Sequence, residues 1–438
     1  MTPETFALYI GDRPPMLEEL DQELGKTAAE HPAICTLREI GRSREGRPMT
    51  MLTMPGGPSH VLVIGAPHPN EPIGLAVIPA LARYLAEHPQ AREEVSWHLV
   101  GCADPDGVAA NQDWWATTWP PTLEDYHRGL YRPVAAAQPE WTFPAPAFDA
   151  TLPETCALMR VIDDVRPALT VSLHGSDSGG VWAMASRAEP ALPQVMADLA
   201  ARYSLRVEQT PSDCIGLPPF GAGAYLLAPP APAETDGSPG GGDDREWEPA
   251  GSSSAHYTAR HGGLGLFPEV PMWASAPIRL SPQEAIGVLE DARHVLGDLI
   301  AEYAAASDEE SVFLTSAKEI RSIIPLMIRQ IQENPEAGRD QDLVLLVPAR
   351  AAGMLLRHGD QLLSATPDCE QLQALRTKTE AVLLSWCHRA EKALRPRPMP
   401  LSRTAGYQAE MVLAMAGVLS TAPPGTPGPK GRACPAAP

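Results

Sequence analysis

A continuous apolar run, His60 to Gly65 (HVLVIG), places the strongest constraint on the fold of this chain. Such a run is typical of a β-strand buried on both faces, as in a parallel sheet covered by helices. Pro72, a residue favoured at the first position of a helix, follows and opens a helix expected to run to about residue 88. Other expected strands lie at 36–40, 50–53, 95–102, 169–173 and 264–267, and other expected helices at 15–30 and 282–304. This alternation predicts an α/β fold with a mixed, centrally parallel sheet flanked by helices.

The composition and the hydrophobic periodicity change along the 438 residues of the chain, and these changes predict three parts. Helical periodicity without a chemical motif recurs late in the chain, over 311–333, 368–394 and 403–420. A stretch rich in Pro, Gly, Ser and acidic residues interrupts the first part, and such a composition favours a flexible segment. We therefore predict an α/β domain over 1–305 with a flexible acidic insertion at 228–254, a mostly helical extension over 306–420, and a disordered tail over 421–438.

Composition narrows the class of protein. Hydrophobic residues make up 44% of the chain and charged residues 20%, which is typical of a folded protein. The net charge of −20 argues against nucleic acid as the main partner, because phosphate binding needs a cationic surface. No apolar run reaches the roughly 18 residues of a membrane helix, and the first residues lack the pattern of an export signal. The seven cysteines are scattered and never form a CxxC pair. These features predict a cytoplasmic protein with reduced thiols and no membrane partner, and they indicate no oligomeric state.

Two potential metal ligands follow the buried strand directly, in the segment Pro67-His68-Pro69-Asn70-Glu71-Pro72. The prolines keep this segment out of the following helix, so His68 and Glu71 can converge on one point. Ligands of open parallel sheets bind at the carboxyl ends of strands, and this segment lies at such an end. A His-x-x-Glu spacing alone is also common in solvated loops, so the position at the strand end is what favours a metal site.

A third ligand candidate, His174, ends another apolar strand and is followed by Gly175. Two imidazoles and one carboxylate with an open fourth position form a set typical of catalytic zinc, which activates water for attack on a carbonyl. Glu269 ends a further apolar strand between two prolines, and an apolar environment would raise its pKa toward the range of a general base. Taken alone, Glu269 is better explained as an ordinary charged residue at the exit of a strand.

In this order, the segments resemble the zinc carboxypeptidases of the carboxypeptidase A-like family, over about residues 1–305. The stretch Ile40–Arg47 resembles the family's early G-x-S-x-x-G-R turn. Cys102–Gly107 resembles its N-P-D-G turn, and residues 253–271 resemble the approach to its catalytic glutamate. The resemblance implies the zinc carboxypeptidase fold and a bound Zn²⁺ ion.

By the same resemblance His68, Glu71 and His174 match the metal ligands and Glu269 matches the general base. The chain departs from the family in the loop after the N-P-D-G-like turn, where no Asn-Arg pair is present to bind the substrate carboxylate.

Five other residues are candidates for substrate binding. Arg128 and Arg132 are the arginines of the loop, and a guanidinium suits both carboxylate and oxyanion binding, although a solvated loop charge explains either residue equally well. Asn111 could assist them. The family's capping tyrosine would fall in the acidic insertion, which has none, so Tyr225 is the candidate from the N-terminal side. Ser254 lies near the position where the family reads the leaving side chain.

The sequence therefore predicts a zinc-dependent metallocarboxypeptidase that hydrolyses the C-terminal amide bond of a peptide or peptide-like metabolite. The missing Asn-Arg pair leaves an alternative, a zinc-dependent deacylase of N-acyl amino acids similar to aspartoacylase and succinylglutamate desuccinylase. A third hypothesis is an inactive binding or scaffold protein on a peptidase fold. It is disfavoured because such relatives normally lose a ligand or the base, and all four groups are present here.

Overall fold

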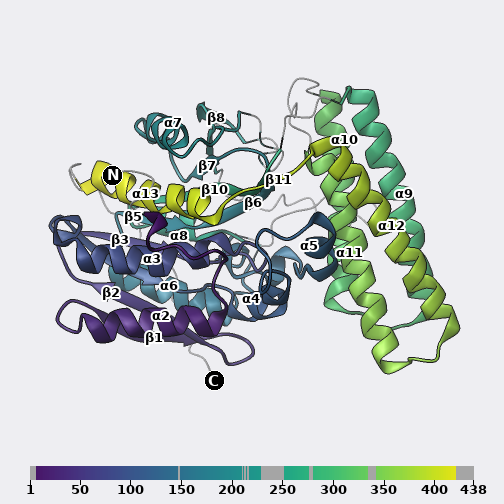
Figure 1. Ribbon diagram of the computed structural model, residues 1–438, viewed down its shortest axis with the longest axis horizontal. Coiled ribbons are helices and arrows are strands. Elements are labelled where there is room, and N and C mark those ends of the chain that lie inside the picture. Colours follow the sequence, from purple (N-terminus) through teal and green to yellow (C-terminus); the bar gives the residue numbers. More distant parts are fainter. Residues whose placement is uncertain are drawn as a thin grey trace.

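A mixed β-sheet with helices on both faces and a separate bundle of helices beside it make up the protein (Figure 1). The computed structural model describes residues 6–146, 148–209, 211, 214, 217–227, 251–275, 280–333 and 342–420. The predicted acidic insertion, apart from its last four residues, and the predicted tail lie outside the described residues.

Eleven strands form the sheet over the described residues. They are β1 (Thr36–Arg42), β2 (Pro48–Met54), β3 (Ser59–Ile64), β4 (Val95–Val100), β5 (Leu169–Ser172), β6 (His174–Ser178), β7 (Trp182–Ala185), β8 (Pro219–Gly221), β9 (Ala224–Leu226), β10 (Leu264–Ala274) and β11 (Arg397–Pro398). Their order is β1-β2-β4-β3-β5-β10-β7-β9-β8, and β6 and β11 both pair with β10. The strands β4, β3, β5 and β10 run parallel at the centre, and antiparallel pairs lie toward both edges. The predicted fold class is confirmed.

The apolar run that led the sequence interpretation forms β3, at the centre of the sheet. It runs parallel to both neighbours, with Val63 opposite Leu99 of β4 and Val171 of β5. Val63 lies in the apolar core on one face of the sheet, and Leu62 lies in the core on the other. Burial on both faces explains why the strand is continuously apolar from Val61 to Ile64 rather than alternating with polar residues.

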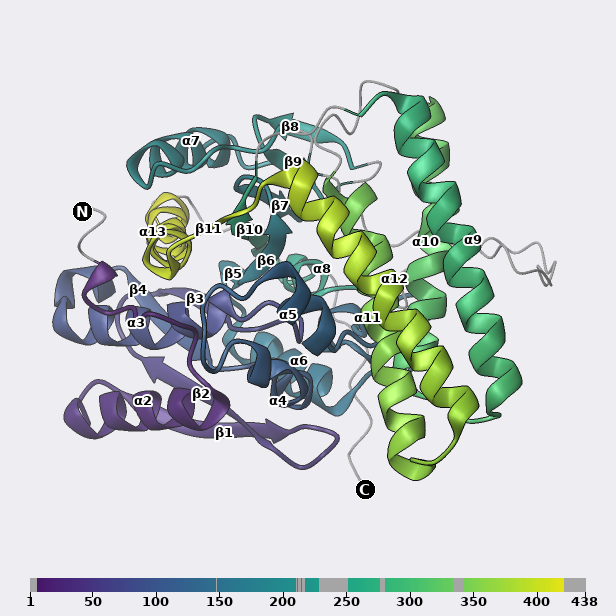
Figure 2. The ribbon, with the colours of Figure 1, turned by 45° about the vertical axis from the view of Figure 1, so that its right-hand side comes forward.

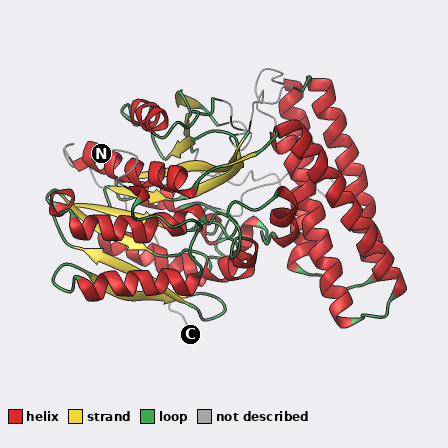
Figure 3. Ribbon diagram, viewed as in Figure 1, coloured by secondary structure: helices red, strands yellow, loops and turns green. Residues whose placement is uncertain are grey.

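Helices cover the two faces of this sheet. The helices before the bundle are α2 (Leu17–Glu30), α3 (Ile73–Glu87), α4 (Pro105–Asn111), α5 (Leu123–Gly129), α6 (Pro153–Val165), α7 (Leu192–Arg202) and α8 (Ser254–Ala259). In Figure 1, α2 and α3 lie in front of the strands and α6 and α8 lie behind them. Figure 3 shows the same layering, with strands only in the sheet part of the molecule.

The bundle consists of α9 (Pro282–Ala306), α10 (Val312–Glu333), α11 (Asp342–Ala365) and α12 (Glu370–Leu394). In Figure 2 these helices stand beside the sheet, and α5 is the sheet-domain helix that packs against α11 and α12. Helix α11 was not expected from the sequence. Sixteen of its 24 residues are buried, because it packs against α9, α10 and α12 of the bundle and against α5.

The division of the chain differs from the predicted boundary at 305/306. Helix α9 packs against α10, α11 and α12, so it belongs with the bundle rather than with the sheet. The last described helix, α13 (Leu401–Ser420), leaves the bundle and packs against α3, α7 and β10. The predicted helical extension is therefore a four-helix bundle plus one helix that completes the covering of the sheet.

Three smaller expectations are tested by the same structure. Ser253 caps α8 through its side chain, so the end of the predicted flexible insertion is ordered. Five cysteines of the described residues are free thiols, whereas Cys156 is disulfide-bonded, so the expectation of reduced thiols is wrong for Cys156. Among the described helices, none combines the length and apolar character needed to cross a bilayer. The cytoplasmic location stays a prediction.

Candidate metal centre

The short connection between β3 and α3 turns His68 and Glu71 into the interior. The Glu71 N–H donates to the His68 carbonyl over 3.3 Å, which closes a turn between the two residues. Pro72 then occupies the N-cap position of α3, and a proline disfavours the helical conformation for the residue before it, Glu71. His68 is 2% exposed and Glu71 is 8% exposed. Both side chains are therefore buried at the carboxyl end of the central strand, as the sequence predicted.

His174 and Glu269 reach the same point from neighbouring strands. His174 begins β6, and it lies directly opposite Glu269 in the parallel pairing of β6 with β10. His174 Nδ1 is 3.3 Å from Glu71 Oε2 and 3.7 Å from Glu269 Oε1. One potential ligand atom each of His68, Glu71 and His174 lies within 4.8 Å of the others, and all three residues are buried.

The protonation of this cluster suits a divalent metal. Burial lowers the pKa of His68 well below its usual value, so its imidazole is neutral. Burial opposes the charge of Glu71, but the hydrogen bond with His174 and the positive charge of Arg132 favour it, and the pKa of Glu71 is lowered. The Nδ1 atom of His68 is buried and meets no hydrogen-bond partner among the described residues. Two imidazoles and one carboxylate fit a catalytic zinc ion, and the Nδ1 atom of His68 is available as a metal ligand.

Aromatic rings form one wall of the centre. The ring of Trp141 lies 5.6 Å from that of His68, and the ring of Phe267 lies 4.4 Å from that of His174. Phe267 belongs to a buried apolar cluster with Trp182 and Tyr225. These rings exclude water from one side of the ligands and strengthen electrostatic interactions there.

Gln408 of α13 connects β6 and β10, the strands that carry His174 and Glu269. The sequence did not single out this residue. Its side-chain amide donates to the carbonyl of His174 over 2.6 Å and to that of Pro268 over 2.9 Å. Pro268 has no N–H to donate, so the sheet hydrogen bonding is interrupted just before Glu269. The amide of Gln408 satisfies two carbonyls at this interruption and orients both His174 and Glu269.

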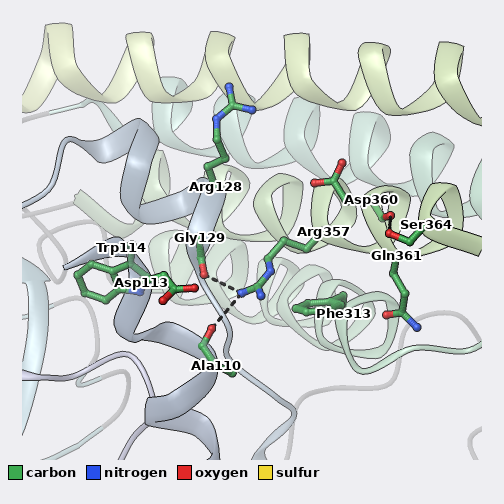
Figure 4. Close-up of a pocket in the computed structure, with 10 residues that line it drawn as sticks. All are labelled: Ala110, Asp113, Trp114, Arg128, Gly129, Phe313, Arg357, Asp360, Gln361 and Ser364. Carbon is green, nitrogen blue, oxygen red and sulfur yellow. Dashed lines mark hydrogen bonds between the residues drawn. The ribbon is translucent and has the colours of Figure 1, made fainter. Parts of the chain in front are cut away.

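Only one of the two candidate arginines lies at the centre. Arg132 donates to Asn70 Oδ1 over 2.6 Å and approaches Glu71 Oε1 to 3.4 Å. Arg128 instead binds two carboxylates, Glu124 at 2.8 Å and Glu380 at 2.5 Å. It lines a hollow of about 370 Å³ between α5 and the bundle, shown in Figure 4. Loop position could not distinguish the two residues, because the distinction depends on Glu380, 252 positions further along the chain.

The other three substrate-binding candidates are engaged inside the protein. Asn111 uses both ends of its amide, accepting from Tyr131 N and Trp114 Nε1 and donating to the carbonyls of Gly107 and Tyr131. The hydroxyl of Tyr225 donates to the carbonyl of Gln209. These hydrogen bonds give Asn111 and Tyr225 structural partners rather than the substrate contacts expected for them.

Ser254 lies at the start of α8 and is fully buried. Its N–H donates to Glu140 Oε1 over 2.8 Å, and its hydroxyl has no partner among the described residues. Glu140 also accepts from Ser172 over 3.0 Å, so this buried carboxylate ties α8 to the end of β5. Burial raises the pKa of Glu140, while His174 and the hydrogen bonds from Ser254 and Ser172 act in the opposite direction. The sequence carried no signal for Glu140 beyond its place in a Trp-rich loop.

Comparison with known proteins identifies the family. The family model described as zinc carboxypeptidase matches residues 20–264, more than half of the chain. The chain belongs to the zinc carboxypeptidase family. The resemblance drawn from its motifs is therefore confirmed, and the match covers His68, Glu71 and His174 but ends before Glu269.

Individual relatives are distant. Carboxypeptidase E of Caenorhabditis elegans is 35% identical over 104 residues, which cover 20% of this chain and 22% of the relative. A metallo-carboxypeptidase from Burkholderia cenocepacia is 20% identical, with a TM-score of 0.38 over 59% of this chain and 60% of that one. Carboxypeptidase A of Helicoverpa armigera is 14% identical, with a TM-score of 0.38 over 78% of this chain and 74% of that one. The chain thus spans less than two thirds of the first two proteins, and family membership rests on the sequence match.

Proposed function

We propose that this protein is a zinc-dependent metallocarboxypeptidase that hydrolyses the C-terminal amide bond of a peptide or peptide-like metabolite. The observation that carries the proposal is the position of Glu269, whose carboxylate lies 3.7 Å from His174 beside the His68, Glu71 and His174 cluster. A metal site with a carboxylate of this kind beside it can both activate water and move its proton.

The four residues divide into two roles. His68, Glu71 and His174 would hold zinc, which supplies Lewis-acid chemistry by polarising the scissile carbonyl and acidifying water. Glu269 accepts the proton of the attacking water and delivers it to the departing amine nitrogen. Only 6% of Glu269 is exposed, so bulk water competes little for this proton transfer.

Arg132 supplies the positive charge for the carbonyl oxygen. About a quarter of its side chain is exposed, and its guanidinium lies between the buried Asn70 and solvent. A guanidinium at this position can stabilise the negative charge that develops on the carbonyl oxygen during attack. The same group is the candidate for binding a substrate carboxylate.

The alternative deacylase activity keeps one specific observation in its favour. Arg128 is bound by two glutamates and Asn111 is saturated by backbone and indole partners, so neither is available for the terminal carboxylate of a peptide. A zinc-dependent deacylase of N-acyl amino acids would use the same ligands and base.

The test compares the wild-type protein with Glu269→Gln, after zinc content has been measured in both. We expect stoichiometric zinc in both proteins and a loss of kcat of about 10²- to 10⁴-fold in the variant, since the base is removed without a ligand. Glu290→Gln, an exposed carboxylate of α9, is the matched control and should keep full activity. Full activity in Glu269→Gln with zinc bound would refute the mechanism.

The substrate is assigned in the same assay by comparing N-blocked dipeptides with simple N-acyl amino acids. We expect release of the C-terminal amino acid from the blocked dipeptides. Turnover of acetyl or succinyl amino acids alone would replace the carboxypeptidase by the deacylase, and no turnover with zinc bound would support a binding role instead.

A further inference from the structure

We infer that the helical bundle is part of the active site, and that Arg350 of α11 is a positioning residue for Asn70 and Arg132 beside the metal centre. The effect on catalysis rests on the proposed function. The family match ends at residue 264, so it assigns no role to α11.

The first step of the connection joins the bundle to the sheet. Arg350 donates to Asp177 Oδ2 through Nε at 3.1 Å and Nη2 at 2.8 Å, and Asp177 lies on β6 three residues after His174. Asp177 is 4% exposed and the Arg350 side chain is 14% exposed. A second tie lies nearby, because Ser178 donates to Asp342 at the start of α11 over 2.5 Å. The amino-terminal half of α11 is therefore fixed to the strand that carries a metal ligand.

The second step joins Asp177 to residues 67–72, the segment with His68 and Glu71 that we call the metal loop. The hydroxyl of Tyr126 on α5 donates to Asp177 Oδ1 over 2.8 Å and accepts from Asn70 Nδ2 over 2.9 Å. Asn70 Oδ1 in turn accepts from Arg132 over 2.6 Å. Tyr126 is fully buried and Asn70 is 2% exposed, so water does not replace these partners. Five side chains thus form one unbroken line from the bundle to the residue beside Glu71.

The direction of each hydrogen bond follows from the residue at the bundle end. A guanidinium only donates and a carboxylate only accepts, so Tyr126 must give its single proton to Asp177. The phenol oxygen then accepts from the nitrogen of the Asn70 amide, which leaves the amide oxygen turned toward Arg132. Loss of the Arg350 guanidinium would remove the donor that fixes the Asp177 carboxylate. The Tyr126 hydroxyl and the Asn70 amide would then be held less firmly, and with them the amide oxygen that accepts from Arg132.

The chain offers a matched control on the same helix. Arg357, two turns after Arg350 on α11, donates to the carbonyls of Ala110 and Gly129 over 3.5 Å and 2.6 Å, as Figure 4 shows. It ties the bundle to the sheet domain as Arg350 does, but its partners are backbone carbonyls that do not lead to Asn70. Substitution of Arg357 should therefore weaken the packing of the bundle without reorienting the metal loop.

The experiment compares Arg350→Met and Arg357→Met in the full chain, by zinc content, Tm, kcat and KM, and hydrogen exchange of peptides covering residues 64–78. We expect both variants to bind zinc and to lose a similar amount of Tm. Only Arg350→Met should exchange faster in the metal loop and lose about ten- to a hundredfold in kcat/KM, the scale of a small misplacement of catalytic groups. Arg350→Lys, which keeps the positive charge, should recover part of that loss.

Tyr126→Phe provides a second variant that removes one oxygen and leaves the ion pair in place. Combined with Arg350→Met it should add little further loss, because both act through the same line of hydrogen bonds. Equal exchange in the metal loop of the Arg350 and Arg357 variants, or fully additive losses in the double variant, would overturn the inference. Since exchange is measured without substrate, a wild-type protein that hydrolyses nothing would refute the proposed function while leaving this positioning role testable.

Discussion

The carboxyl edge of the sheet and the core of the helical bundle bury opposite kinds of side chain. At the sheet edge the buried groups are ionisable: His68, Glu71, Glu140, His174 and Glu269. In the bundle the buried groups are mainly aliphatic, for example Leu296, Leu299, Ile324, Leu345, Leu355 and Leu383. Burying a charge costs free energy unless a partner compensates it, whereas burying an aliphatic side chain is favourable in itself. The comparison indicates that the sheet edge is built for a ligand and the core of the bundle for stability.

The buried polar groups of the bundle are few, and they bond mainly to other groups of the bundle. Ser311 bonds His358 over 2.9 Å, and Tyr303 bonds Thr379 over 3.1 Å. Both regions hold a buried imidazole nitrogen without a hydrogen-bond partner, Nδ1 of His68 and Nε2 of His358. The sheet edge differs because His68 lies with Glu71 and His174, whose potential ligand atoms are within 4.8 Å of one another, whereas His358 belongs to no such group among the described residues. An unpaired buried nitrogen is tolerated where a metal completes it, and the following predictions test that difference between the two regions.

Removal of a metal ligand should give the largest effect. His174→Ala leaves two ligands, so we expect loss of bound zinc and activity at background, and chelation of the wild-type protein should reproduce both and lower its Tm. His98→Ala, a buried histidine of β4 outside the cluster, should keep zinc. If His174→Ala retained zinc at full occupancy, the buried ionisable groups of the sheet edge would not be explained by zinc binding.

A cavity in the bundle should affect stability without affecting the site. Leu355 of α11 is fully buried, and Leu355→Ala is expected to lower the free energy of unfolding by about 2–5 kcal/mol. Urea denaturation measures this loss, and zinc content and kcat/KM should match the wild type. A fall in kcat/KM as large as that of a sheet-edge variant would show that the two regions are not separable in this way.

Asp104 tests the cost of a buried charge behind the metal loop. Mainly because of burial, its pKa is raised to about 7, with Glu154 and Asp106 adding to the rise and the Gly107 N–H and Arg44 opposing it. The unfolded chain releases this proton near pH 4, so between about pH 4 and 7 the folded state binds the extra proton. The contribution of Asp104 to the free energy of unfolding is therefore fully present below about pH 4. It is lost as the pH rises to about 7, by roughly 1.4 kcal/mol for each pH unit.

The variant Asp104→Asn removes this proton and should flatten that part of the pH dependence. The measurement is the free energy of unfolding from urea titrations at pH 5, 6 and 7. Asp298→Asn, an exposed carboxylate of α9, serves as the control and should keep the wild-type slope. An unchanged slope in Asp104→Asn would mean that this buried carboxyl does not carry the extra proton.

The smallest expected effect concerns the contact of α13 with the centre. Gln408→Met keeps the volume of the side chain but leaves the carbonyls of His174 and Pro268 without donors. We expect about a tenfold loss of zinc affinity, measured by competition with a chelator, which is the scale for residues that orient metal ligands. Thr404→Val on the same helix removes a hydroxyl that bonds only Leu401 and should leave zinc affinity unchanged. Equal zinc affinity in both variants would confine Gln408 to a structural role.

The amino-acid sequence by itself determined the centre of the sheet and the candidate zinc ligands. The apolar run of β3, the prolines around His68 and Glu71, and the histidine after β5 are local signals. Parallel strands bring their carboxyl ends to one edge whatever the rest of the chain does. For that reason the meeting of His68, Glu71 and His174 at one point could be predicted before any contact was known.

Tertiary structure alone decided which other residues serve the centre. Arg128 and Arg132 are alike in the sequence, and only the packing of α12 against α5 gives Arg128 its second carboxylate. Gln408 and Arg350 lie at least 140 residues from the atoms that they hold. Hydrogen bonds between such distant residues depend on how helices pack, and apolar packing patterns do not specify which polar side chains meet.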